Sequence, residues 1–212
     1  PPPPPPPQQQ PAVRAESYGQ RGVTLVDRFG VWLSRRPVEA VVRRYPAPRL
    51  LDVGCGFEAT LLRGLAPRLG AGVGVDVRVG DAAKATPNLT FHEAPAESVL
   101  GTLADTTFDV VLLVSVLEHL WDPQAALAGC HRLLRPGGSL VVNVPNWLGK
   151  RALEFSAFRL GTSPAAEMDD HKMYYAKRDL WPLLVRAGFR PSRIRMRYHK
   201  LGLNLLAVGS RQ

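Results

Sequence analysis

The spacing of hydrophobic positions changes along the chain and divides it into elements. From 17 to 45, apolar residues recur every three or four positions, which predicts two short helices separated at Pro37. Residues 1–16 are rich in proline and cannot bury a core, so we expect a disordered tail there. The ordered part of the chain is therefore expected to begin near residue 17.

The middle of the chain alternates strand patterns with helix patterns. Short apolar runs predict five strands, over 49–53, 72–76, 89–92, 108–115 and 139–144. Helical spacing predicts helices over 59–69 and 123–134, the second with Asp122 as its N-cap. Runs that are apolar throughout are typical of parallel strands buried on both faces. This order predicts a parallel sheet covered by helices on both sides.

The C-terminal part has a different order. A predicted helix over 177–187 is followed by two strands, 193–198 and 203–208, which are joined by the short connection 199–202. Such a connection allows only antiparallel pairing. The arginines of 193–197 alternate with apolar residues, a pattern that protects an edge strand. The predicted fold is an α/β Rossmann-like three-layer sandwich, whose seven-stranded sheet has five parallel strands and a C-terminal antiparallel hairpin.

Residues 17–212 fit one domain, because this length is enough for one full core and too short for two of ordinary size. The connection 145–176 is unusually long for a compact domain, and such connections often carry function. We therefore expect 145–176, together with the N-terminal helices, to form a lid and an acceptor site.

Composition excludes some classes of protein and leaves others open. With 27 basic and 18 acidic residues, the net charge is +9, but the arginines are scattered. This favours a solvated basic surface over nucleic-acid binding. No apolar run reaches the roughly 18 residues of a membrane span. Two cysteines, Cys55 and Cys130, form no disulfide framework, so we expect a reducing, cytoplasmic location.

The segment 50–56 (LLDVGCG) joins a buried strand to a glycine-rich turn. Residues 54–59 satisfy the dinucleotide fingerprint G-x-G-x-x-G/A, and Asp76 lies at the end of the next strand, where a carboxylate binds ribose hydroxyls. These features fit a nicotinamide enzyme and an S-adenosylmethionine (SAM) enzyme equally well. Asp52 favours SAM, because a carboxylate there would repel a pyrophosphate and attract an amino or sulfonium group.

Four motifs together resemble the class I SAM-dependent methyltransferases of the small-molecule type. They are LLDVGCG at 50–56, VGVDV at 73–77, FDVVLLVSVLEHLWDP at 108–123 and LLRPGGSLVVNVPN at 133–146. The cofactor-binding residues that this resemblance implies are Asp52, Gly54, Cys55, Gly56, Asp76, Val77, Ala96, Glu97 and Ser115. In this assignment the glycines approach the methionine part of SAM, and Asp76 accepts hydrogen bonds from the ribose.

The chain departs from the family pattern at two positions. Glu58 stands where the family often has a third glycine, and Pro95 stands where it often has an aspartate that binds the adenine amine. The adenine contact is therefore expected from Glu97, Glu93 or the backbone.

Two histidines are the catalytic candidates. His119 follows the strand 108–115, and His171 lies in the long connection after Asp169 and Asp170; either is a candidate general base. Structural roles are the alternative, with Glu118 and His119 capping a helix or fixing a loop, and His171 solvated or capping. No third ligand lies at a metal-binding spacing, so no metal is predicted.

The sequence thus predicts methyl transfer from SAM to a small-molecule acceptor, which leaves S-adenosylhomocysteine. The segments after residue 144 are similar to methyltransferases of bacterial sugar, exopolysaccharide and natural-product assembly. That similarity favours O-methylation of a sugar or a secondary metabolite. The alternatives are an RNA-modifying methyltransferase, a non-catalytic SAM-binding partner subunit and, more distantly, a nicotinamide enzyme.

Overall fold

The computed structural model describes residues 17–20, 25–150 and 172–212. Its strands are β1 (Arg49–Val53), β2 (Ala71–Asp76), β3 (Leu89–Glu93), β4 (Phe108–Val114), β5 (Leu134–Pro145), β6 (Ile194–His199) and β7 (Asn204–Ser210). Its α-helices are α1 (Leu25–Val42), α2 (Thr60–Leu65), α3 (Asp81–Lys84), α4 (Ala96–Thr102), α5 (Pro123–Leu133) and α8 (Lys177–Arg186). Short 3-10 turns are η1 (Ala66–Arg68), η2 (Leu117–His119) and η4 (Pro191–Arg193). The predicted tail, 1–16, lies outside the described residues.

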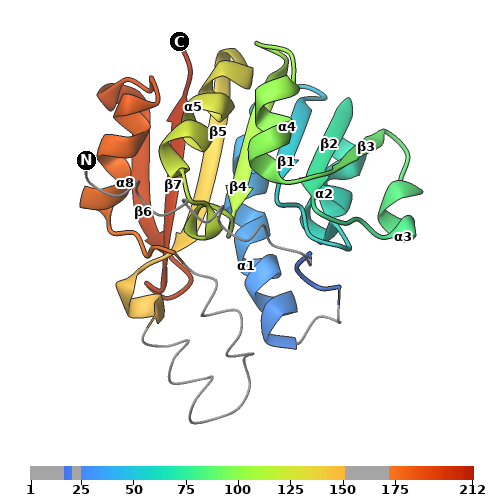
Figure 1. The fold of residues 1–212 in the computed structure, drawn as a ribbon, viewed down its shortest axis with the longest axis horizontal. Coiled ribbons are helices and arrows are strands. Elements are labelled where there is room, and N and C mark those ends of the chain that lie inside the picture. The colour runs from blue at the N-terminus through green and yellow to red at the C-terminus, as the bar shows by residue number, and fades with distance from the viewer. Residues whose placement is uncertain (1–16, 21–24, 151–171) are drawn as a thin grey trace, which may run out of the picture.

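The strands form one seven-stranded sheet in the order β3-β2-β1-β4-β5-β7-β6 (Figure 1). Strands β1 to β5 pair in parallel, whereas β7 pairs antiparallel with both β5 and β6. The predicted sheet of five parallel strands and a terminal hairpin is confirmed. The arginine-bearing strand β6 lies at the edge, so its exposed charges can oppose pairing with another chain.

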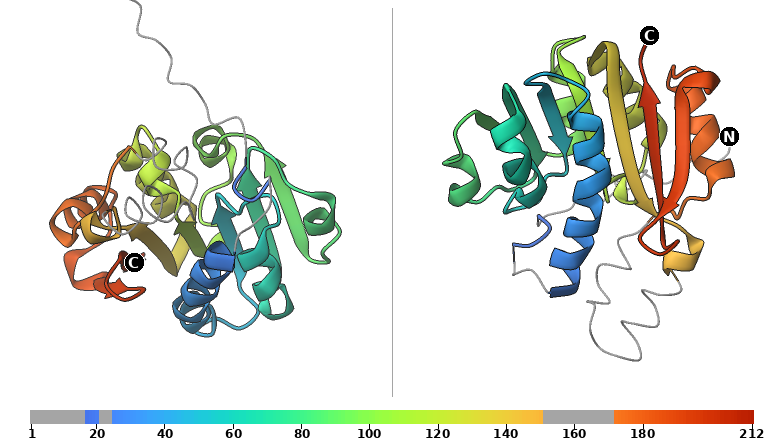
Figure 2. Two further views of the ribbon diagram at one scale, coloured as in Figure 1. Left: turned by 90° about the horizontal axis from the view of Figure 1, so that it is seen from below. Right: turned by 180° about the vertical axis from the view of Figure 1, so that it is seen from behind.

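Helices cover both faces of the sheet and produce three layers. Helices α1 and α2 lie on one face, and α4, α5 and α8 lie on the other (Figures 1 and 2). Alternate residues of each strand serve opposite faces. In β4, Val111 and Leu113 join the apolar cluster of α5 and α8, whereas Val110 and Leu112 join that of α1 and α2. The central strand is therefore buried on both sides.

Residues before β1 form one helix, α1, instead of the two predicted helices. Pro37 lies inside this helix and is buried. Proline has no N–H, so it leaves the carbonyl four residues earlier, that of Leu33, without its helical partner. The Leu33 carbonyl acts to raise the pKa of His199, from the hairpin β6–β7, although burial lowers that pKa overall. The break predicted at Pro37 is wrong, because α1 runs without interruption from Leu25 to Val42.

Two other differences concern short elements. Strand β5 begins at Leu134 instead of Ser139, with a register shift opposite the start of β4. Helices α3 and α4 were not predicted, because a helix of four or seven residues shows too little apolar periodicity. The predicted cap of α5 is confirmed, since Asp122 Oδ1 accepts a hydrogen bond of 2.9 Å from the Ala125 nitrogen.

Among the described residues, no helix has both the length and the apolar character that crossing a membrane requires.

The central position of β4 leads to a stability prediction. Leu112→Ala should lower the free energy of unfolding by about 2–5 kcal/mol, because Leu112 is fully buried and its removal leaves a cavity. Leu201→Ala makes the same chemical change at a site that is 95% exposed, and should cost less than about 0.5 kcal/mol. Urea unfolding of both variants checks this; equal losses would contradict the central role of β4.

Candidate cofactor and active site

The glycine-rich turn after β1 has a backbone that side chains would obstruct. Gly54 and Gly56 have φ angles of 73° and 78°, in the left-handed region. A Cβ on Gly54 would also lie 2.3 Å from Val116 Cγ2. The Gly54 and Cys55 nitrogens donate to the Val75 carbonyl, at 2.7 and 3.1 Å, and so fasten the turn to β2. The turn lies at the carboxyl edge of the parallel strands, where ligands of such sheets bind.

Asp76 ends β2 and faces this turn. Its Oδ2 accepts a hydrogen bond of 2.8 Å from the Gly56 nitrogen, and its Oδ1 accepts one of 2.8 Å from the Val77 nitrogen. The structure thus brings together three of the predicted cofactor residues. Val77 contributes through its backbone, while its side chain is half-buried.

Sequence reasoning missed Ser17, which is the third partner of Asp76. The Ser17 Oγ lies 2.5 Å from Asp76 Oδ1 and accepts a hydrogen bond from the Arg78 nitrogen at 2.7 Å. A carboxylate offers about four acceptor positions, and three donors surround this one. Ribose hydroxyls would therefore have to share the carboxylate with Ser17 or replace it. No local pattern could have revealed this contact, because the two residues are 59 positions apart.

Asp52 is buried beneath the same turn. Desolvation, and then the charge of Asp76, raise the pKa of Asp52 from its ordinary value of 3.8 to about 7. Within the described residues, no hydrogen bond offsets this burial. A cationic group placed here would favour the ionised carboxylate. Cys55 is also buried, and desolvation raises the pKa of its thiol far above the ordinary value, so it is not a nucleophile.

The predicted adenine side of the site has fewer contacts. Ala96 and Glu97 begin α4, where Ala96 is half-buried and Glu97 is exposed. Glu93 is already engaged, because it accepts from the Val79 nitrogen at 2.9 Å and pairs with Lys84 at 2.7 Å. Glu58, the departure from the family's third glycine, lies near Arg63 with an N–O distance of 3.7 Å. Glu97 and the backbone thus stay the predicted adenine contacts.

The acceptor side of the edge is formed by the end of β4 and η2. Ser115 follows β4 in a left-handed conformation, φ 58°, and its nitrogen donates to the Asn143 carbonyl at 2.8 Å. Glu118 is buried and His119 is half-buried in η2. The Glu118 carbonyl accepts a hydrogen bond of 2.7 Å from the Lys172 nitrogen, which fixes the return of the long connection. The other catalytic candidate, His171, lies outside the described residues, as do Asp169 and Asp170.

Lys200 is a second residue that sequence reasoning missed. It lies at the tip of the β6–β7 hairpin, at the same edge of the sheet. Burial lowers the pKa of Lys200 to about 8, and the charge of Glu118 partly opposes that shift. A short surface turn gives no sign of burial in the sequence, so only the packing of the hairpin reveals a partly buried cation whose pKa responds to the charge of Glu118.

These features fit SAM better than a dinucleotide. Within the described residues, no group of three His, Cys, Asp or Glu side chains is placed to hold a metal ion. The open glycine turn, the ribose-type carboxylate and the buried, unneutralised Asp52 match a ligand with a diol and a cationic group. A pyrophosphate would meet the charge of Asp52 unfavourably.

Comparison with known families agrees with this geometry. Residues 51–142 match the family model described as a methyltransferase domain. The chain is 33% identical over 154 residues to a ubiquinone biosynthesis O-methyltransferase of Dinoroseobacter shibae, and this match covers 68% of the chain and 60% of the relative. It is 29% identical over 135 residues to a probable SAM-dependent methyltransferase of Mycolicibacterium smegmatis, covering 60% of the chain and 51% of the relative. The chain thus spans about half to three fifths of these relatives.

Solved structures share the fold. A SAM-dependent methyltransferase of Thermotoga maritima superposes with a TM-score of 0.64 and 19% identity, over 89% of this chain and 92% of that one. A complex of the Haloferax volcanii Trm112 methyltransferase activator gives a TM-score of 0.66 and 16% identity, over 87% and 94%.

The sheet order, the glycine turn with its two carboxylates, and these likenesses define a SAM-binding Rossmann-like domain. Residues 51–142 are thus a methyltransferase domain by their family match, and the chain is similar to SAM-dependent methyltransferases in sequence and in fold.

The carboxylate of Asp76 leads to a binding prediction. Asp76→Asn should weaken binding of S-adenosylhomocysteine by at least about tenfold, because a hydrogen bond to a charged group contributes about 1.5–3 kcal/mol. Asp81→Asn removes the same charge at an exposed position on α3 and should leave the affinity unchanged. Calorimetric titration measures both; an unaltered affinity in Asp76→Asn would refute the ribose role.

The raised pKa of Asp52 leads to a prediction about pH. An unfolded aspartate ionises near pH 4, whereas folded Asp52 keeps its proton up to about pH 7. In this interval the folded state binds more protons, so Asp52 makes the unliganded protein less stable as pH rises from 4 to 7. The stability advantage of Asp52→Asn over the natural chain should therefore grow across that range in urea unfolding. A constant difference would contradict the burial of an uncompensated carboxyl.

Proposed function

We propose that this chain transfers the methyl group of SAM to a hydroxyl oxygen of a small-molecule acceptor. The observation that carries the proposal is the cradle formed by the Gly54–Gly56 turn and the Asp76 carboxylate, which meet through the 2.8 Å bond from the Gly56 nitrogen. The names of the ubiquinone O-methyltransferase relatives support an oxygen acceptor.

Each part of the site has a distinct task in this proposal. Bound SAM supplies an activated methyl group on a sulfonium. Gly54 and Gly56 admit the methionine part, Asp52 faces its amino group, and Asp76 binds the ribose. The acceptor oxygen attacks the methyl carbon while the carbon–sulfur bond breaks and its electrons go to sulfur. The chain chiefly aligns the reactants and excludes water.

His119 is the proposed general base among the described residues. It lies in η2, shortly after β4 and Ser115, and is half-buried. An imidazole at this edge would take the proton that the acceptor hydroxyl loses. Glu118 and Lys200 lie close enough to influence one another's charge and would set the electrostatics beside it.

The acceptor that we propose is a small hydroxylated metabolite, with a sugar or a secondary metabolite as the predicted class. The ubiquinone relatives widen this class to phenolic hydroxyls. The long connection, of which 145–150 and 172–176 are described, is the proposed acceptor lid. Tyr174 and Tyr175 in this segment are buried and stack the segment on the end of β5, where the Tyr175 nitrogen donates to the Pro145 carbonyl at 3.2 Å.

A cytoplasmic location remains part of the proposal. RNA modification and a non-catalytic partner role are the competing functions. The observation offered for the partner role is the structural likeness to a methyltransferase in complex with the Trm112 activator.

The base proposed here is tested by a histidine substitution. His119→Gln should lower kcat for a hydroxyl acceptor by about 10²–10⁴-fold, since general base catalysis contributes that much. Binding of S-adenosylhomocysteine should stay unchanged. His92→Gln, on the exposed part of β3, is the matched control and should keep full activity.

The assay uses radiolabelled SAM with three acceptor pools: phenols, sugars and unmodified RNA. Methyl transfer to the phenol or sugar pool supports the proposal. Transfer to RNA alone would favour the competing function. Cofactor binding without transfer to any pool would favour the partner subunit. Full activity of His119→Gln would show that alignment alone drives the reaction.

A further inference from the structure

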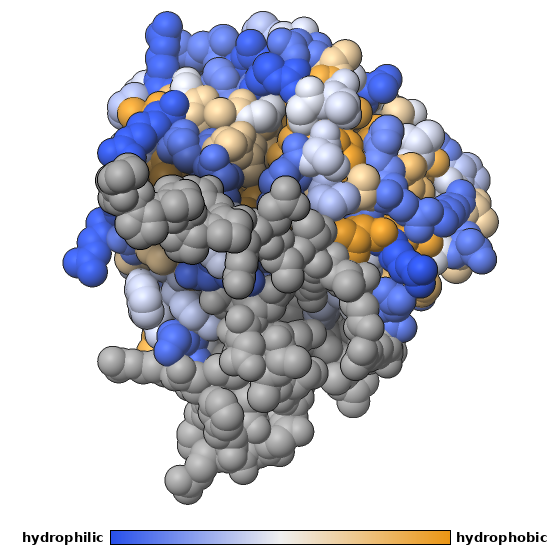
Figure 3. Space-filling model, in the orientation of Figure 1, coloured by the Kyte–Doolittle hydropathy of each residue, from blue (hydrophilic) through white to orange (hydrophobic). Residues whose placement is uncertain are grey.

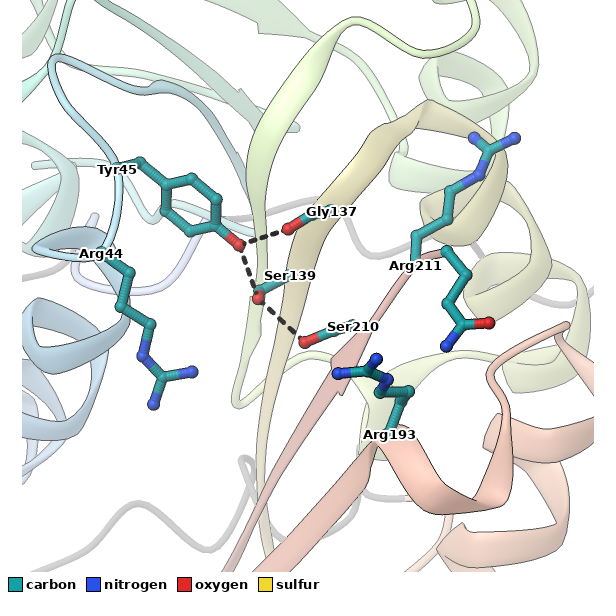
Figure 4. A pocket seen from close by; sticks show the side chains of 8 residues that line it. Arg44, Tyr45, Gly137, Ser139, Arg193, Ser210 and Arg211 are labelled. Atoms are coloured by element: carbon teal, nitrogen blue, oxygen red, sulfur yellow. Dashed lines mark hydrogen bonds between the residues drawn. The ribbon is translucent and has the colours of Figure 1, made fainter.

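A second pocket lies at the amino edge of the sheet, away from the cofactor turn. It has a volume of about 450 Å³ and is lined by residues of the α1–β1 connection, the start of β5, η4 and the C-terminal end of β7 (Figure 4). Strand β5 runs from this pocket at Ser139 to the carboxyl edge at Pro145. The volume is within the range of small-molecule sites, about 300–1,000 Å³. The pocket is therefore distinct from the site described above.

The floor of this pocket is a row of three hydroxyl groups. Tyr45 Oη lies 2.8 Å from Ser139 Oγ, and Ser139 Oγ lies 3.3 Å from Ser210 Oγ. Ser139 and Ser210 are directly opposed in the β5–β7 ladder. On the same face the next residue of β5, Val141, belongs to the apolar core, so the face becomes polar only at the pocket. Hydroxyl groups can turn their protons toward a bound anion.

Two guanidinium groups flank the hydroxyl row. Figure 4 shows Arg44 on one side and Arg193 on the other, with Arg193 directed toward Ser210. Neither is in an ion pair with a described residue. Both are exposed, so both keep their charge available.

The other arginines near this pocket are already engaged. Arg211 points away in Figure 4, and its Nη1 donates to the carbonyls of His131, at 3.1 Å, and Arg132, at 2.7 Å. Arg135 forms an ion pair with Asp109 and lies over the Tyr45 ring. Among the described residues that line the pocket, none has an acidic side chain. The pocket thus has two uncompensated positive charges above a polar floor.

We propose that this pocket binds the phosphoryl group of a soluble metabolite. Arginine forks match the geometry of phosphate oxygens, and hydrogen bonds from charged donors are about twice as strong as neutral ones. The Tyr45 hydroxyl already donates to the Gly137 carbonyl at 2.8 Å, so Ser210, the hydroxyl beside Arg193, is the one that can turn its proton to the anion. This assignment is independent of the methyltransferase activity, because the pocket shares no residue with the cofactor site.

A small phosphorylated ligand suits this pocket better than a nucleic acid. A nucleic acid requires a row of basic groups along its backbone. Here the two available guanidinium groups lie on either side of one short row of hydroxyls, as Figure 4 shows. On the face of the molecule seen in Figure 3, hydrophilic and hydrophobic residues are interspersed.

Calorimetric titration at low salt tests the assignment, with inorganic phosphate and glycerol 3-phosphate as probes and glycerol as the uncharged control. Both phosphates should bind, and glycerol should not. The double variant Arg44→Gln/Arg193→Gln should weaken phosphate binding by at least about tenfold, as expected for lost charge-assisted hydrogen bonds. Ser210→Ala should cause a smaller loss, of a few fold.

The matched control is Arg68→Gln/Arg186→Gln, which removes the same charge at two exposed positions outside the pocket. Its phosphate affinity should stay within about twofold of the natural chain, as usual for surface changes. Equal weakening in both double variants would overturn the proposal in favour of a diffuse basic surface. The proposal would also be overturned if a short single-stranded RNA bound more tightly than the phosphates and only Arg44→Gln/Arg193→Gln weakened that binding. Absence of phosphate binding at about 10 mM would overturn it as well. The affinity for S-adenosylhomocysteine should be unchanged in both double variants, which shows that they are folded correctly. Loss of phosphate binding can then be distinguished from failure of the proposed methyl transfer.

Discussion

The hydrogen bond from the Gly56 nitrogen to the Asp76 carboxylate joins the glycine turn of β1 to the end of β2. This bond needs a backbone with positive φ at Gly54 and Gly56, and it needs the two strands to be parallel neighbours. It also brings two carboxylates, those of Asp52 and Asp76, to one edge with little cationic compensation. The negative charge at this edge is therefore little compensated, and a ligand with a positive group and a diol would stabilise it.

The hairpin β6–β7 does more than complete the sheet. The Leu33 carbonyl, which Pro37 leaves without a helical partner, influences the pKa of His199, so this hairpin packs close to α1. Its tip also places Lys200 near Glu118 at the acceptor side. One antiparallel connection thus supports the helix that covers the sheet and supplies charge to the candidate active edge.

The same strands serve two polar sites at opposite edges. Strand β5 has Ser139 beside the cationic pocket and Asn143 and Pro145 near the carboxyl edge, with buried valines between them. A buried apolar centre with polar ends is what a parallel strand allows, because only its ends reach solvent. Function at the two edges can therefore differ without disturbing the core.

The order of elements and the cofactor turn could be predicted from local sequence. Apolar runs and glycine spacing act over a few residues, so the five parallel strands and the terminal hairpin were predicted in their observed order, with β5 starting at Leu134 instead of Ser139. The continuity of α1 through Pro37 could not be predicted, because a proline inside a helical pattern ordinarily ends or kinks the helix.

What the sequence by itself determined is therefore the class of fold and the cofactor chemistry, both of which rest on short-range pattern. The tertiary structure alone decided which distant groups meet: Ser17 at the Asp76 carboxylate, Lys200 beside Glu118, and Arg44 with Arg193 around the serine hydroxyls. These contacts arise from packing of segments far apart in the chain, and no local periodicity records such packing.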